Sequence, residues 1–147
     1  MMKDAQHVKI VMIEDDEGHA RLIEKHIRRV GVTNDIVAFR DGSSALKFLF
    51  DAGEASEQAR QPCLILLDLN LPDMTGVDIL ARLKSHEDTR RSPVVVLTTT
   101  DDQREIQRCY DLGANVYMTK PLQSESFANA IRQLGLFLAV MQIPEVN

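Results

Sequence analysis

The segment Cys63–Pro72 has the sequence CLILLDLNLP, in which five apolar residues are followed directly by an aspartate. An unbroken apolar run of this length is typical of a strand that is covered on both faces. Four other short runs are similarly apolar and rich in β-branched residues: Val8–Ile13, Asp35–Phe39, Val94–Thr98 and Asn115–Thr119. The chain therefore contains five candidate strands.

Helical patterns alternate with these strands. After the first strand, apolar residues from Leu22 to Val30 recur at spacings of three and four, and Gly31 follows as a stop signal. The later helices are expected to begin at Asp41 or Ser43, at Thr75, at Asp101 and near Gln123, the last one running to Leu138. Five alternations predict a parallel sheet with helices on both faces. The polar stretch Asp51–Gln61 is expected to be a long, flexible loop.

The composition excludes several classes of protein. A chain of 147 residues, 44% apolar and with a net charge of −5, is typical of one globular domain. It has no apolar run near the ~20 residues of a membrane span, and no secretory signal at Met1–Lys9. Cys63 and Cys109 are expected to be free thiols of a cytoplasmic protein. The excess of 22 acidic over 17 basic residues argues against a nucleic-acid partner.

The polar residues with most chemical interest follow the predicted strands. Glu14 and Asp15 follow the first strand, Asp68 follows the third, Thr98 ends the fourth and Lys120 follows the fifth. The carboxyl ends of parallel strands meet at one edge of the sheet, where ligands bind. Three carboxylates there need a counter-cation, and oxygen ligands favour Mg²⁺. Asp68, flanked by a metal and a lysine, could then act as a nucleophile toward phosphorus.

This pattern resembles the receiver domain of two-component response regulators, over essentially the whole chain. The matching landmarks are Glu14-Asp15, Asp68, Pro72, Gly76, Thr98, Tyr117 and Lys120-Pro121. The resemblance implies a flavodoxin-like, doubly wound (βα)5 fold whose five parallel strands have the order 2-1-3-4-5.

The resemblance also implies a role for each matching residue. Asp68 would accept a phosphoryl group from a histidine kinase. The implied ligands of Mg²⁺, for which Mn²⁺ or Ca²⁺ could substitute, are Glu14, Asp15, Asp68 and the backbone carbonyl of Asn70. Lys120 would pair with a phosphoryl oxygen, and its peptide bond to Pro121 would be cis.

Four positions would control the conformational change on phosphorylation and the lifetime of the phosphoryl group. Thr98 would bond the phosphoryl group, and Tyr117 would turn inward as Thr98 moves. Asn70 and Thr100 occupy the positions that tune dephosphorylation in the family. Thr99 stands where a smaller residue is usual, which would narrow access to the phosphoryl group.

Other features are similar to single-domain regulators paired with phytochrome histidine kinases. They are the loop Asp51–Gln61, the runs Leu64–Pro72 and Val96–Thr100, and an apolar C-terminal extension. A bacteriophytochrome is therefore an expected partner. A receiver core over about residues 7–135 would leave no room for an output domain in these 147 residues.

The C-terminal extension, residues 136–147, predicts a homodimer. Eight of the ten residues from Leu134 to Ile143 are apolar, more than one helical stripe requires. Leu136, Val140 and Ile143 lie outside the stripe that the core would use, and together with Phe137 they are expected to contact a second copy.

Two other functions compete with the receiver interpretation. A haloacid-dehalogenase-type phosphatase also uses an aspartate after a strand, but needs a second one where Asn70 stands. A flavodoxin-like nucleotide binder needs a phosphate-binding first loop, where Glu14, Asp15 and Asp16 would instead repel phosphate. Of the histidines, His26 is expected in the core, whereas His19, near the acids, is expected to be mainly solvated.

Overall fold

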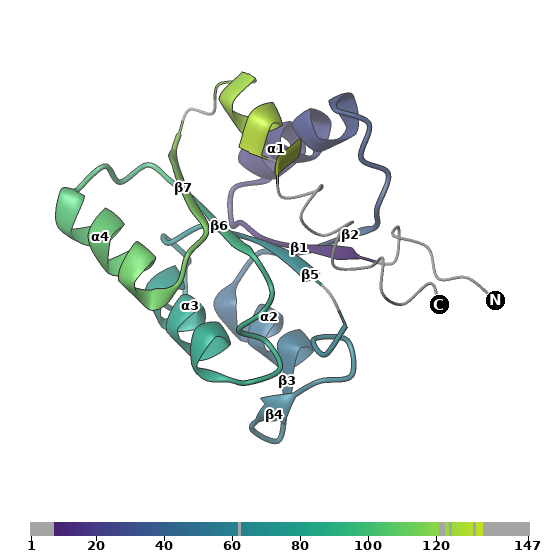
Figure 1. The fold of residues 1–147 in the computed structure, drawn as a ribbon, viewed down its shortest axis with the longest axis vertical. Coiled ribbons are helices and arrows are strands. Elements are labelled where there is room, and N and C mark those ends of the chain that lie inside the picture. Colours follow the sequence, from purple (N-terminus) through teal and green to yellow (C-terminus); the bar gives the residue numbers. More distant parts are fainter. Residues whose placement is uncertain (1–7, 62, 121–122, 124, 131, 134–147) are drawn as a thin grey trace.

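The computed structural model describes residues 8–61, 63–120, 123, 125–130 and 132–133. Its centre is a five-stranded parallel sheet with the order β2-β1-β5-β6-β7 (Figure 1). The strands are β1 (Lys9–Ile13), β2 (Ile36–Phe39), β5 (Cys63–Leu67), β6 (Val94–Thr98) and β7 (Val116–Thr119). Counting these five strands along the chain gives the order 2-1-3-4-5, so the expected doubly wound fold is confirmed.

Helices cover both faces of the sheet. The bounded helices are α1 (Glu17–Arg29), α2 (Gly42–Leu49), α3 (Gly76–Ser85) and α4 (Gln103–Leu112). Residues 125–130 and 132–133 are also helical and lie beside α1, whereas α2, α3 and α4 lie on the opposite side of the sheet (Figure 1). None of the helices in the described ranges is long and apolar enough to cross a membrane.

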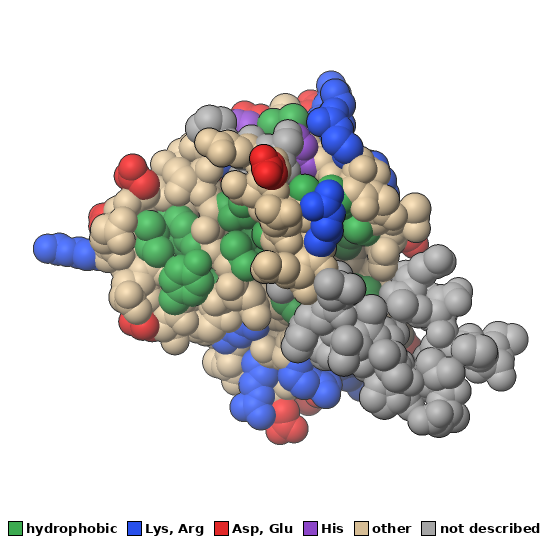
Figure 2. Space-filling model, turned by 45° about the horizontal axis from the view of Figure 1, so that its top comes forward, with side chains coloured by type: hydrophobic (Ala, Val, Ile, Leu, Met, Phe, Trp, Pro, Cys, Tyr) green, Lys and Arg blue, Asp and Glu red, His purple; other side chains and the backbone are tan. Residues whose placement is uncertain are grey.

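The two helical layers explain why the strands are apolar throughout. Along β1, Ile10 and Met12 pack in the cluster that contains Ile23 and Ile27 of α1, together with Phe127. Val11 and Ile13, which alternate with them along β1, pack in a second cluster that contains side chains of α2, α3 and α4. Because side chains alternate along a strand, both sets must be apolar. Outside this core, hydrophobic side chains appear only as separate patches on the face shown in Figure 2.

The expected starts of α2 and α3 agree with the structure and that of α4 is one residue early, whereas the expected end of the last helix at Leu138 lies outside the described residues. The side chain of Asp41, rather than Ser43, caps α2 by accepting a hydrogen bond from the backbone nitrogen of Ser44 at 2.6 Å. Thr75 caps α3 as expected. The cap of α4 is Asp102, one residue after the predicted Asp101, because its carboxylate accepts from the backbone nitrogen of Arg104. Two adjacent aspartates are equally good N-cap candidates in a sequence. Only the structure shows which carboxylate meets the free backbone nitrogens of the helix.

The stretch Asp51–Gln61 is more ordered than the sequence predicts. Phe50–Asp51 (β3) and Glu54–Ala55 (β4) form an antiparallel hairpin. Its two central residues, Ala52 and Gly53, have φ angles of 53° and 84°, as tight hairpin turns require. Phe50 is buried, and the guanidinium of Arg82 lies 4.4 Å from the centre of its ring. The Ala-Gly pair is a weak turn signal because alanine rarely adopts positive φ, so the hairpin was missed.

Candidate functional site

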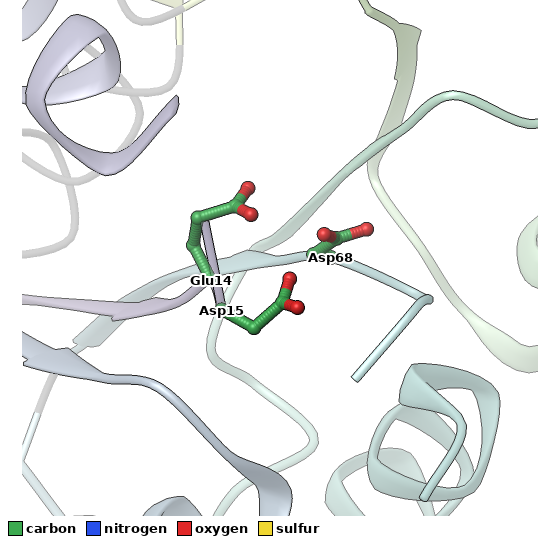
Figure 3. Close-up of side chains that lie close together, drawn as sticks. All are labelled: Glu14, Asp15 and Asp68. Atoms are coloured by element: carbon green, nitrogen blue, oxygen red, sulfur yellow. The ribbon is translucent and has the colours of Figure 1, made fainter. Parts of the chain in front are cut away.

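Three carboxylates meet at the carboxyl edge of the sheet. Glu14 and Asp15 directly follow β1, Asp68 directly follows β5, and one oxygen of each lies within 4.8 Å of the others. Figure 3 shows the three side chains projecting from the two strand ends into the same space. Glu14 and Asp68 are buried, whereas Asp15 is exposed. The site is therefore open to solvent on the Asp15 side.

A shallow pocket of about 410 Å³ extends the site on this side. Asp15 and Asn70 line it on one side, and Pro72, Met74 and Thr75 of the β5–α3 loop on another. The pocket therefore reaches the carboxylate of Asp15, the exposed member of the three.

Lys120 supplies the positive charge of the site. It follows β7, and its ammonium nitrogen lies 2.5 Å from Glu14 Oε1 and 3.3 Å from Asp68 Oδ2. Its backbone nitrogen bonds the carbonyl of Thr98 at 2.7 Å, which ties the end of β7 to that of β6. Only 5% of its side chain is exposed, so the ammonium is held among the acids. Pro121 lies outside the described residues, as does the expected cis bond.

Burial dominates the electrostatics of Glu14. Desolvation raises the pKa of this carboxyl to about 7, although hydrogen bonds from Lys120 and from the backbone of Asp16 oppose that rise. The nearby Asp68 raises it further. One ammonium does not balance three carboxylates, and an added cation would favour their ionised forms. All three offer oxygen ligands, so the donor set fits Mg²⁺.

The loop after β5 fixes the backbone around Asp68. The backbone nitrogen of Asn70 donates to Asp68 Oδ1 at 3.1 Å, and Asn70 forms an isolated bridge with Thr75. A Cβ on Gly76 would lie only 2.3 Å from the carbonyl oxygen of Asp68. Glycine at the start of α3 therefore lets the helix pack directly against the strand end.

Thr98 ends β6 and Tyr117 lies in β7, the two strands that follow β5 in the sheet. The buried hydroxyl of Thr98 accepts hydrogen bonds from the side-chain amide of Asn70 at 3.2 Å and from the backbone nitrogen of Thr100 at 3.5 Å. The half-buried Tyr117 donates its hydroxyl to the carbonyl of Thr100 at 2.8 Å. Hydrogen bonds thus link the two predicted switch residues, Thr98 and Tyr117, to the two residues predicted to tune dephosphorylation, Asn70 and Thr100.

Two side chains make contacts that the sequence does not predict. His19 was expected to be mainly solvated, but its Nδ1 lies 3.2 Å from the ammonium of Lys120, with 44% of the side chain exposed. Asp73 accepts three hydrogen bonds from Gly42 and Ser43 at the start of α2. His26 is buried against Phe127 as predicted. Leu136, Phe137, Val140 and Ile143 lie outside the described residues.

The fold and site define a class: a doubly wound α/β domain with an acidic cation site and a lysine at the ends of its strands. The model of the response regulator receiver domain matches residues 10–132, and the chain belongs to this family.

Proteins with phytochrome-linked names are among its relatives. Response regulator Rcp1 of Synechocystis sp. is 39% identical over 111 residues, 76% of this chain and 75% of that protein. A crystal structure of a response regulator receiver domain from Rhodospirillum rubrum is 70% identical, with a TM-score of 0.79, over 95% of this chain and 99% of that one. The phosphorylated cyanobacterial phytochrome response regulator RcpA is 35% identical, with a TM-score of 0.71, over 90% and 94% of the two chains.

Proposed function

We propose that this protein accepts a phosphoryl group on Asp68 from a histidine kinase, with Mg²⁺ bound at the acidic site. One observation carries the proposal: the ammonium of Lys120 and the carboxylates of Glu14 and Asp15 converge on Asp68. A buried carboxylate between a cation site and an ammonium is suited to attack phosphorus, because both positive charges stabilise the transferred oxygens.

The step exchanges one phosphorus bond for another. A carboxylate oxygen of Asp68 bonds to phosphorus, the bond from phosphorus to the donor's imidazole nitrogen breaks, and that nitrogen keeps the electron pair. Glu14, Asp15, Asp68 and the carbonyl of Asn70 would hold Mg²⁺, which supplies charge stabilisation to the transferred oxygens. Lys120 would bind one of these oxygens and the hydroxyl of Thr98 another.

The change at Thr98 would carry the signal outward. Its hydroxyl accepts a hydrogen bond from the amide of Asn70 and would donate its own proton to a phosphoryl oxygen, which draws Thr98 toward Asp68. Movement of Thr98 pulls on the segment that ends at Thr100, which Tyr117 bonds. We infer that Tyr117 turns inward in this step and that Asn70 and Thr100 set the lifetime of the acyl phosphate.

The partner that we propose is a cytoplasmic histidine kinase of the bacteriophytochrome type. The support is the similarity to the phytochrome response regulator RcpA over most of the chain. The alternative of an aspartate-dependent phosphatase has less support, because Asn70 cannot act as the general acid that such enzymes place there. No described feature favours a flavin or nucleotide site at the acidic first loop.

The test is labelling of the full chain by the kinase or by acetyl phosphate, with Mg²⁺ present. Asp68→Asn is nearly isosteric and should abolish labelling while leaving the thermal melt close to that of the wild type. Asp78→Asn, which removes an exposed carboxylate on α3, is the matched control and should label normally. Undiminished labelling of Asp68→Asn would disprove the assignment.

A further inference from the structure

The imidazole of His19 is one of three groups that surround the ammonium of Lys120. Its Nδ1 lies 3.2 Å from that nitrogen, beside the contacts with Glu14 at 2.5 Å and Asp68 at 3.3 Å. The same Nδ1 lies 3.9 Å from the nearest oxygens of Glu14 and Asp16, beyond hydrogen-bond distance. The hydrogen-bond partner of His19 is therefore the lysine rather than an acid.

The first turn of α1 places His19 for this contact. Asp16 is the N-cap, and its carboxylate accepts a hydrogen bond from the backbone nitrogen of His19 at 2.9 Å. Side chains of a helix lean toward its N-terminus. For α1 that direction is the end of β1, where Glu14 lies, so capping at Asp16 directs the imidazole toward the acids and Lys120.

The chemistry of the pair defines the tautomer. A lysine ammonium has three donors and no acceptor, so Nδ1 of His19 must accept and cannot carry a proton. This hydrogen bond requires the tautomer of the imidazole that carries its proton on Nε2. Glu14, His19 and Asp68 match the three donors of Lys120 one to one.

The three partners differ in what happens to them during phosphorylation. Glu14 and Asp68 both acquire new partners when a cation binds and a phosphoryl group arrives. His19 is neutral and has one ring nitrogen already directed at the lysine, so it can keep its bond throughout. Without it, Lys120 would be held only by groups whose own bonding changes during the reaction.

We propose that His19 is a positioning residue, which accepts a hydrogen bond from Lys120 and holds the ammonium over Asp68. This inference rests on the proposed phosphorylation of Asp68. His19 acts through Lys120 and does not itself contact the reacting atoms.

The first test reads the tautomer in the unphosphorylated full chain. At about pH 8, where an ordinary imidazole is neutral, nitrogen NMR of the ring should show unprotonated Nδ1 and protonated Nε2 for His19. Lys120→Met should change the His19 signals and leave those of His86 unchanged. A proton on Nδ1 of His19 in the wild type would overturn the proposal, whether or not the Lys120 variant folds.

The second test measures the rate of labelling by acetyl phosphate with Mg²⁺. His19→Leu should slow labelling by roughly ten- to a hundredfold, the effect of losing one hydrogen bond to a charged group. His19→Asn should restore the rate to within about twofold, since its side-chain oxygen can accept the same bond. His86→Leu is the matched control outside the site and should label as the wild type does.

The outcomes separate the two proposals. Wild-type rates in His19→Leu, or an asparagine variant no faster than the leucine variant, would overturn the role of His19 alone. Failure of the wild type to label would overturn the phosphorylation of Asp68 and this role with it, while the NMR signature would still report the contact between His19 and Lys120.

Discussion

At the scale of single residues, the three carboxylates of the site repel one another because one ammonium cannot neutralise them all. Burial raises the pKa of Glu14 to about 7 despite the contact with Lys120, and the charge of Asp68 adds a smaller part of that rise. Such a site is destabilising when no cation is bound and becomes stabilising when one is. Function here is obtained at a cost in the stability of the metal-free protein.

Removing one of these carboxylates should therefore stabilise the metal-free protein. Asp15→Ala is expected to raise the free energy of unfolding without metal by about 1 kcal/mol, a modest value because Asp15 is exposed. It should also remove most of the rise in melting temperature that Mg²⁺ gives the wild type.

The measurement is a pair of thermal melts, one with a chelator and one with Mg²⁺. Glu87→Ala, at an exposed acid outside the site, is the control and should keep the response of the wild type to Mg²⁺. If Asp15→Ala melts clearly below the wild type without metal, the acids do not form a repulsive cluster.

At the scale of elements, the loop after β5 is attached to α2 as well as to α3. Asp73 accepts hydrogen bonds from the backbone nitrogens of Gly42 and Ser43, at 2.8 and 2.9 Å, and from the Ser43 hydroxyl at 2.6 Å. These bonds, led by that of the hydroxyl, lower the pKa of Asp73 to about 2. The loop that carries Asn70 is thus fixed at the start of a second helix.

This contact should make stability depend on pH in acid. The pKa of Asp73 is lowered by folding, so its ionised form stabilises the protein above the unfolded pKa of about 3.9, and that contribution is lost as the pH falls toward 2. Asp73→Asn should be less stable than the wild type at neutral pH. The difference should shrink between about pH 4 and pH 2.

Denaturant unfolding at a series of pH values measures this difference. Glu57→Gln removes an exposed carboxylate from the segment after β4 and serves as the control. A gap between Asp73→Asn and the wild type that stays constant down to pH 2 would contradict the assigned bonds.

The elements also show which features could be predicted from sequence. The strands were predictable because continuous apolar runs report burial on both faces, and the site acids because strand ends meet at one edge. The sequence places His19 near the acids but does not predict its contact with Lys120, which depends on how the first turn of α1 is capped at Asp16. The contacts of Asp73 were not predictable either, because it accepts hydrogen bonds from residues about 30 positions earlier in the chain. Contacts between two loops that are distant in the chain leave no periodic pattern of apolar residues in the sequence.

At the scale of the whole molecule, the apolar C-terminal extension, residues 136–147, is the expected contact with a second copy. Among the described residues, only Leu22 and Tyr110 are large hydrophobics with high exposure. Figure 2 accordingly shows separate hydrophobic patches on the face it presents. We propose that Leu136, Phe137, Val140 and Ile143 contact a second copy of the chain in a twofold homodimer.

Light scattering on the full chain and on a chain that ends at Gly135 tests this proposal. The full chain should be dimeric and the shortened one monomeric, because each buried side chain of this size contributes roughly 1.5–3 kcal/mol before the costs of association. A full chain that is monomeric at tens of micromolar, with and without phosphorylation, would exclude the dimer.

The close contact between Gly76 and the carbonyl of Asp68 determines where movement can begin. A single added methyl group would overlap that oxygen, so Asp68 and the start of α3 have no clearance between them, and we expect them to move together. On the other side, Thr98 is joined to Asn70 by a single hydrogen bond that can be exchanged. We therefore expect a conformational signal that starts at a phosphorylated Asp68 to travel through β6 and β7 toward α4, with α3 as the fixed support.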